Sequence, residues 1–207
     1  MVEKRRWFRG AWCGLAFLMF AIPAELRGDD WEEVRLLGEA GFQHAGTLDD
    51  IVPLPDGKRV LTSSRAGTTR LWDLESGKLL RRYQREDGGD VWGLLLLPGG
   101  KEFLSAAEHG VVSRWEVETG KELMTYQHEG TAFRLAMHPD GERFVATDNK
   151  KIVIMWELKT GKELKRFVGH EKSVYTAAFV AGGDLLVTGG SDGKLKVWDT
   201  ATGDCER

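Results

Sequence analysis

Apolar and polar residues alternate in short runs along most of the chain, and glycine-containing turns separate the runs. The clearest copy of this pattern lies at residues 169–199. Its apolar positions are Tyr175, Ala177, Phe179, 185–187, Leu195, Val197 and Trp198. Its turns are GGD at 182–184 and SDG at 191–193. A period of two with many β-branched residues is typical of half-buried strands, so this stretch predicts three strands joined by two tight turns.

The same unit recurs four times when the chain is aligned on tryptophans that precede an acidic residue. These tryptophans are Trp72, Trp115, Trp156 and Trp198, spaced 43, 41 and 42 residues apart. A turn centre lies 16 residues before each one, at Asp56, Gly99, Asp140 and Gly182. Another marked position lies 28 residues before each one and carries His44, Asp87, His128 and His170. The shared phase of three kinds of marker indicates an internal repeat.

A period near 42 with Gly-His at 169–170 and Trp-Asp at 198–199 resembles the WD-repeat (WD40) β-propeller family, in which each repeat supplies four strands of a blade. The resemblance covers residues 31–207. It implies an all-β fold with four recognisable four-stranded blades within residues 44–207. Residues 25–43 would form a leading strand and loop, in which Trp31–Leu37 completes the last blade. Because propellers of this family commonly have about seven blades, we expect a partial propeller.

In that family a His, a Ser or Thr, an Asp and the Trp form a hydrogen-bonded tetrad inside the blade. Carried over by position, the tetrad here is His170, Thr188, Asp192 and Trp198. The other copies carry Ala66, His109 and Lys150 at the Asp position, and Thr62, Ser105 and Ala146 at the Thr position. A buried hydrogen-bond network stabilises the fold much less when some of its polar groups lack a partner. We therefore expect the fourth blade to be the most strongly locked, and the others to rely more on apolar packing.

A second set of repeat positions suggests a binding surface. Five residues after each His position stand Asp49, Trp92, Phe133 and Tyr175. Just before each Asp position, expected on the same face, stand Arg65, Glu108, Asn149 and Ser191. Aromatic rings surrounded by mixed polar groups predict a patch that binds a protein or peptide. The alternative is that the rings only cover the blade tops, since isolated surface hydrophobics are common.

The first 24 residues have the order of a secretory signal: a basic start, about a dozen apolar residues and a small residue at Ala24. The apolar run is short for a membrane span, which needs about 20 residues. We expect cleavage and export to the periplasm or outside the cell, with no stable membrane span afterwards. An uncleaved anchor is the alternative. Arg5-Arg6 suggests the twin-arginine route.

Composition and motifs restrict the function further. The net charge of −3 gives no reason to expect nucleic acid as a partner. The nucleophile elbow, the metal-binding helix, the paired Cys-x-x-Cys motif and the phosphate-binding loop are missing from the sequence. We expect no metal or cofactor and a non-enzymatic interaction scaffold. The alternative is a propeller module of a larger extracytoplasmic enzyme or sensor. Four blades are compatible with a small ring, with half of a ring that a homo-oligomer completes, or with a fragment of a longer chain.

Overall fold

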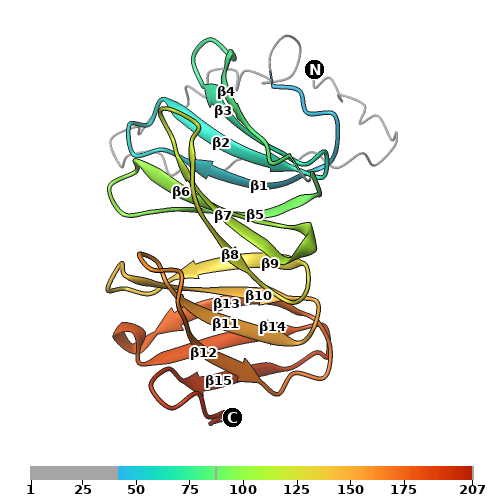
Figure 1. The fold of residues 1–207 in the computed structure, drawn as a ribbon, viewed down its shortest axis with the longest axis vertical. Helices are drawn as coiled ribbons and strands as arrows, with labels where there is room; N and C mark the ends of the chain where they lie inside the picture. Colours follow the sequence, from blue (N-terminus) through green and yellow to red (C-terminus); the bar gives the residue numbers. More distant parts are fainter. Residues whose placement is uncertain (1–41, 87, 207) are drawn as a thin grey trace, which may run out of the picture. The chain divides into compact units, whose positions relative to one another are not determined.

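The structure is a computed structural model that describes residues 42–86 and 88–206. The predicted signal at 1–24 and the predicted leading strand Trp31–Leu37 lie outside these residues. The described part consists of antiparallel sheets that follow one another in chain order (Figure 1). We call these sheets blades 1 to 4, and the prediction of an all-β partial propeller is confirmed.

Each blade is a meander in which neighbouring strands in sequence are hydrogen-bonded neighbours in space. Blade 1 contains β1 (Leu48–Pro53), β2 (Arg59–Ser64), β3 (Thr68–Asp73) and β4 (Leu79–Tyr83). Blade 2 contains β5 (Val91–Leu96), β6 (Glu102–Ala107), β7 (Val111–Glu116) and β8 (Glu122–Gln127). Blade 3 contains β9 (Ala132–Met137), β10 (Arg143–Asp148), β11 (Ile152–Glu157) and β12 (Glu163–Val168). Blade 4 contains β13 (Val174–Val180), β14 (Leu185–Gly190) and β15 (Leu195–Asp199). Two short 3-10 turns, η1 (Glu108–Gly110) and η2 (Ala181–Gly183), complete the elements.

Blade 4 differs from the expected four strands, because the described residues supply three. After β15 the chain turns at Gly203, and an isolated bridge then pairs Cys205 with Trp198. That bridge lies where the outer strand of the other blades pairs with the tryptophan strand. The edge of β15 therefore lacks a full partner strand within the described chain.

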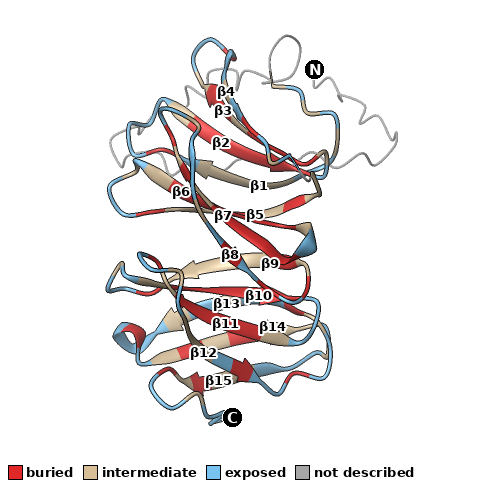
Figure 2. Ribbon diagram, in the orientation of Figure 1, coloured by how far each residue is buried: buried red, intermediate tan, exposed pale blue. Residues whose placement is uncertain are grey.

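The core lies between successive blades. The second strand of each of the first three blades is buried on both of its faces, and Phe144, Val145 and Ala146 of β10 are all inaccessible to solvent. Figure 2 shows this burial in red along β2, β6 and β10. Three apolar clusters fill the spaces between blades 1 and 2, blades 2 and 3, and blades 3 and 4. Burial of apolar area between sheets is therefore the main interaction that orders the repeat.

The turn between the first two strands of a blade forms locally, as the sequence indicates. The carboxylate of Asp140 accepts the backbone N–H of Glu142 at 2.8 Å, and Gly141 adopts a φ of 73°. Blade 1 repeats the arrangement, with Asp56 accepting the N–H of Lys58 at 2.9 Å. Asp followed by Gly suits such a turn because the carboxylate mimics a backbone acceptor and Gly tolerates positive φ.

Candidate binding surface

The four positions predicted to form a binding surface share one local feature, a β-bulge in or opposite the first strand of each blade. Pairing between the first two strands shifts register around Asp49, Trp92 and Tyr175, since the residues on either side oppose consecutive residues of the second strand. Phe133 lies in the corresponding irregular step of blade 3. A bulge bends the strand and re-aims a side chain. The sequence placed these residues correctly in phase but did not reveal the bulges.

The aromatic side chains of successive blades meet edge to face or at a tilt. The ring of Trp92 lies 5.4 Å from that of Phe133 at an interplanar angle of 78°. The ring of Phe133 lies 5.0 Å from that of Tyr175 at 35°. These separations lie within the range favourable for aromatic pairs. We call Trp92, Phe133 and Tyr175 the aromatic row, which runs across blades 2, 3 and 4.

Blade 1 contributes a charged end to the row. The guanidinium carbon of Arg65 lies 4.4 Å from the centre of the Trp92 ring, which is a cation–π contact. Arg65 also donates to the carboxylate of Asp49 at 3.2 Å. The Arg65 side chain remains 47% exposed, while that of Asp49 is 9% exposed. Asp49 therefore holds Arg65 against Trp92 and leaves part of the guanidinium in solvent.

The row is partly accessible. Tyr175 is 52% exposed, whereas Trp92 and Phe133 are of intermediate burial. The indole Nε1 of Trp92 is buried and has no hydrogen-bond partner within the described chain. The rings thus cover the blade tops in part, and they also present an apolar surface to solvent.

Contacts between blades hold the backbone beneath the row. Arg134 donates to the carbonyl of Trp92 and, at 3.2 Å, to that of Asp49, so one side chain of blade 3 contacts blades 1 and 2. Asp50 accepts the backbone N–H of Leu94 at 2.9 Å. A Cβ at Gly93 would lie 2.4 Å from the carbonyl oxygen of Phe133. The glycine therefore permits the close approach of β5 and β9 that brings Trp92 beside Phe133.

The predicted polar positions are placed on the same end of each blade by a repeated backbone bond. The N–H groups of Arg65, Glu108, Asn149 and Ser191 donate to the carbonyls of Thr47, Asp90, Thr131 and Ser173. Three of the four side chains also bond to the loop that precedes the first strand of the same blade. The bonds are Glu108 Oε2 with Asp90 N–H at 3.3 Å, Asn149 Oδ1 with Thr131 N–H at 3.0 Å, and Ser191 Oγ with Ser173 O at 3.3 Å. Of these four side chains, Arg65 is therefore the one with a described contact to the aromatic row.

The Glu108 loop also carries an electrostatic perturbation. Burial raises the pKa of Asp90, and the negative charge of Glu108 raises it further. The positive charge of Arg65 lowers the pKa of Asp90 in turn, so these acidic side chains and Arg65 influence one another at the same end of the row.

The structure brings the four residues of the predicted tetrad together in blade 4. Nδ1 of His170 lies 2.9 Å from Asp192 Oδ2, and Nε2 lies 2.8 Å from Thr188 Oγ1. The indole N–H of Trp198 donates to the same hydroxyl at 2.8 Å. With the imidazole proton of His170 on Nδ1, this ring and the Thr188 hydroxyl, the Asp192 carboxylate and the Trp198 indole all have hydrogen-bond partners within the tetrad. The backbone N–H of Glu171, together with the imidazole of His170, holds the pKa of Asp192 well below its usual range.

Blades 1 and 2 contain shorter versions of the network. In blade 1, Thr62 Oγ1 accepts the N–H of Trp72 at 2.8 Å and contacts His44 Nε2 at 2.6 Å. His44 Nδ1 has no partner among the described residues, because Ala66 stands at the Asp position. In blade 2, Ser105 accepts the N–H of Trp115 at 2.9 Å.

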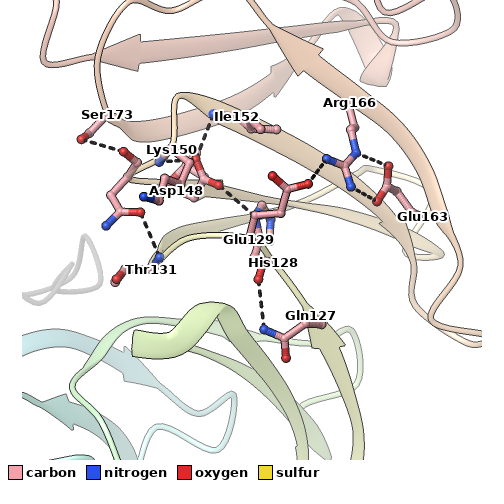
Figure 3. A network of polar contacts seen from close by, with 12 residues as sticks. Gln127, His128, Glu129, Thr131, Asp148, Lys150, Ile152, Glu163, Arg166 and Ser173 are labelled. Atoms are coloured by element: carbon pink, nitrogen blue, oxygen red, sulfur yellow. Dashed lines mark hydrogen bonds and ion pairs between the residues drawn. The ribbon is translucent and has the colours of Figure 1, made fainter.

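Blade 3 uses a carboxylate that the repeat alignment did not identify. Asp148, which is fully buried, lies 3.3 Å from His128 Nδ1 and also accepts the backbone N–H groups of Lys150 and Ile152 at 2.9 Å (Figure 3). Asp148 occupies the repeat position of Gly190, where a Cβ would point at the His170 ring, 2.6 Å from its Nδ1. A side chain at this position is therefore aimed at the imidazole. The direction of this Cβ could not be read from the sequence.

No group of three or more His, Cys, Asp or Glu side chains within the described residues is arranged to hold a metal ion. No helix in the same part of the chain is long and apolar enough to span a bilayer. The aromatic row is a candidate functional surface because three rings and one arginine from four blades meet in it.

Comparisons with known proteins agree with the fold. Residues 28–168 match the family model described as outer membrane protein assembly factor BamB. Residues 161–199 match the model described as WD domain, G-beta repeat. Protein tipD of Dictyostelium discoideum is 49% identical over 39 residues, which is 19% of this chain and 6% of that protein. The chain thus spans only a small fraction of this relative.

Proposed function

Because the chain belongs to the β-propeller family described as outer membrane protein assembly factor BamB, we propose that it is an exported, non-enzymatic scaffold that binds a protein or peptide. The aromatic row carries this proposal. Three rings and one arginine from four blades form one partly exposed surface. The WD-repeat match at residues 161–199 supports the same role by analogy of fold alone.

The chemistry of the row suits a protein interface. Aromatic and arginine side chains dominate interface energies because they bring large contact areas for little lost conformational entropy. The ring contacts and the bulges fix Trp92 and Phe133 before a partner arrives. The exposed part of Arg65 would bind a carboxylate or a backbone carbonyl of the partner and so set its orientation. We propose that Glu108, Asn149 and Ser191 line this surface but contribute less, because their polar atoms already bond to the loop before the first strand of the same blade.

Export is the second part of the proposal. Its support is the basic and apolar order of residues 1–24 and the outer-membrane description of the matching family. N-terminal sequencing of the protein from the extracytoplasmic fraction should give a start near Glu25. An intact Met1 on protein from the cytoplasm would contradict export.

The binding proposal is tested by substitution of the row. A partner is first isolated by pull-down from the extracytoplasmic fraction and identified, and its Kd is then measured by calorimetry. Tyr175→Ala is the cleanest change, because this ring is the most exposed of the three. Trp92→Ala and Phe133→Ala follow, each expected to weaken binding by about 2 kcal/mol, or about 30-fold.

Matched controls lie at the other end of the blades, about 20 Å away along a six-residue strand. Lys58→Glu and Glu142→Lys change exposed residues in the turns between the first two strands. These variants should bind like the wild type. Unchanged binding by a correctly folded Tyr175→Ala and Phe133→Ala double variant would refute the proposed site.

A further inference from the structure

Two arginines stand directly opposite each other on neighbouring strands of blade 1. In the antiparallel register of β3 and β4, Arg70 is the partner of Arg82. We call these two residues the arginine pair. Directly opposite residues project from the same side of a sheet with their Cβ atoms about 5 Å apart, and like charges in this arrangement destabilise the sheet. A negative charge beside the arginine pair would therefore stabilise blade 1.

Blade 3 has an arginine at the same repeat position, and two carboxylates neutralise it. Arg166 is the equivalent of Arg82, at the same step of the register between the last two strands of its blade. Its guanidinium donates to Glu163 at 2.6 Å and also to Glu129 (Figure 3). The residue opposite Arg166 is Ile154, which carries no charge. Blade 3 thus combines one cation with two anions at this place.

Blade 1 has apolar residues in place of both carboxylates. Leu79 opposes the repeat tryptophan of blade 1, as Glu163 does in blade 3. Ala45 directly follows the repeat histidine of blade 1, as Glu129 does in blade 3. Within residues 42–86 and 88–206, neither member of the arginine pair has a carboxylate as an ion-pair partner. The substitutions between the two blades therefore remove two anions and add one cation.

The Arg70 guanidinium is held in place by contacts that do not neutralise it. One of its Nη atoms donates to the backbone carbonyl of Gln43. Its central carbon lies 5.8 Å from the centre of the Trp72 ring. Its Nε is buried and has no hydrogen-bond partner among the described residues. Arg82, in contrast, is exposed, so a ligand can approach the arginine pair from solvent.

The two charges act on each other and on a neighbouring histidine. Burial lowers the pKa of Arg70, and the positive charge of Arg82 lowers it further. Burial lowers the pKa of His44 to about 4, and the charges of Arg70 and Arg82 add to this shift. His44 is therefore neutral at pH 7. The arginine pair leaves two positive charges at this place.

We propose that the arginine pair binds a phosphate group. Guanidinium groups bind oxyanions through parallel N–H···O bonds, which a planar fork of donors favours. A phosphate monoester carries about −1.5 to −2 charges at pH 7 and three strong acceptor oxygens, which matches two guanidinium groups. A carboxylate carries a single negative charge and would leave the other guanidinium uncompensated. The recognising chemistry is the same for free phosphate and for a phosphate ester of a larger molecule.

The phosphate site goes beyond the proposed scaffold function. The arginine pair lies on β3 and β4, the last two strands of blade 1. It shares no residue with the aromatic row. Loss of phosphate binding would therefore leave the scaffold proposal untouched, and loss of partner binding would leave the phosphate site untouched.

The first test measures binding of inorganic phosphate to the full 207-residue chain by calorimetry, with chloride adjusted to hold the ionic strength constant. We expect saturable binding by the wild type. Arg82→Gln should raise the Kd at least about tenfold, because a charge-assisted hydrogen bond is lost. Arg166→Gln is the matched control, since Arg166 occupies the same repeat position but has its own carboxylates, and it should bind phosphate like the wild type. A wild type that does not bind phosphate, or an equal Kd in Arg82→Gln, overturns the proposal.

A stability measurement supplies a readout that ordinary surface charges would not give. In dilute chloride without phosphate, Arg82→Gln should have a higher Tm than the wild type, because the repulsion within the arginine pair is relieved. Arg166→Gln should have a lower or equal Tm, because its two carboxylates lose their cation. Phosphate should raise the Tm of the wild type and leave that of Arg82→Gln nearly unchanged. A lower Tm for Arg82→Gln without phosphate would contradict the proposal, since it would mean that the charge of Arg82 is already compensated.

Two further ligands define the chemistry of the site. Sodium acetate at the same ionic strength should bind at least about tenfold more weakly than phosphate, because its single charge compensates one guanidinium only. Equal binding of acetate would assign the site to carboxylates and overturn the proposal. Glycerol 1-phosphate separates the two sources of the phosphate group. Tighter binding of this ester than of inorganic phosphate supports an esterified ligand, and weaker binding supports free phosphate.

Discussion

Replacing Ala146 by threonine should stabilise the protein, which is unusual for a change at a fully buried position. Two buried ring nitrogens of blade 3, Trp156 Nε1 and His128 Nε2, have no hydrogen-bond partner within the described chain. Their counterparts in blade 4 both bond to the hydroxyl of Thr188. Ala146 stands at that position in blade 3 and has no hydroxyl to offer.

The space for the hydroxyl already exists. The rings of His128 and Trp156 are 6.1 Å apart, and the rings of His170 and Trp198, which hold Thr188 between them, are 6.2 Å apart. With Asp148 accepting from Nδ1 of His128, the threonine would donate to Nε2 and accept from Trp156. An unsatisfied buried polar group costs about 1–3 kcal/mol. Allowing for crowding by the added methyl group, we expect a net gain of about 2 kcal/mol.

Thermal and denaturant unfolding measure the gain. For a chain of this size, about 2 kcal/mol corresponds to a rise in Tm of roughly 4–8 °C. Ala146→Val is the control, because valine has nearly the shape of threonine without the hydroxyl. The threonine variant should be more stable than the valine variant by more than about 2 kcal/mol, because valine brings the same crowding without the hydrogen bonds. Equal stabilities of the two variants would show that the two nitrogens already have partners or that the ring geometry is wrong.

Two further predictions concern blade 1 and the packing under the aromatic row. Burial, reinforced by the positive charges of Arg70 and Arg82, lowers the pKa of His44 from 6.5 to about 4, so the unfolded chain binds more protons between these values. Stability should therefore be complete above about pH 6.5 and fall as the pH drops toward 4. The free energy of unfolding, measured with urea at several pH values in this range, should depend less steeply on pH in His44→Asn than in the wild type. An identical pH dependence in the two proteins would contradict the assignment. Gly93→Ala should cost about 2 kcal/mol by overpacking, because its Cβ would lie 2.4 Å from the carbonyl oxygen of Phe133. An unchanged unfolding midpoint would mean that blades 2 and 3 are less closely packed than described.

The repeat alignment predicted the tetrad of blade 4, but it did not predict how the network differs in blade 3. Aligning the chain on its tryptophans placed His170, Thr188 and Asp192 at the positions where the structure joins them to Trp198. The same alignment assigned Lys150 to the acidic position of blade 3 and missed Asp148. The reason is geometric, since two positions in the turn can aim a carboxylate at the same imidazole. The repeat alignment compares positions along the sequence, and it contains no information on the direction in which each Cβ points.

The binding surface was predictable only in its residue types. The sequence showed that Trp92, Phe133 and Tyr175 share one repeat position. It did not show that their rings touch, because contacts between residues about 42 positions apart depend on the spacing between blades. That spacing depends on the bulges and on the close approach at Gly93.

The sequence by itself determined the blade unit, the four copies of it within residues 44–207 and the alternation of apolar positions along each strand. Alternation with a period of two fixes which side chains face the neighbouring blades, and turn residues fix where each strand ends. Only the tertiary structure decided which equivalent positions are covered. Leu195 and Val153 occupy the same repeat position and are both apolar, yet one is 73% exposed and the other is at 0%. Burial depends on whether a neighbouring blade packs against the residue, and the sequence of one blade does not show this.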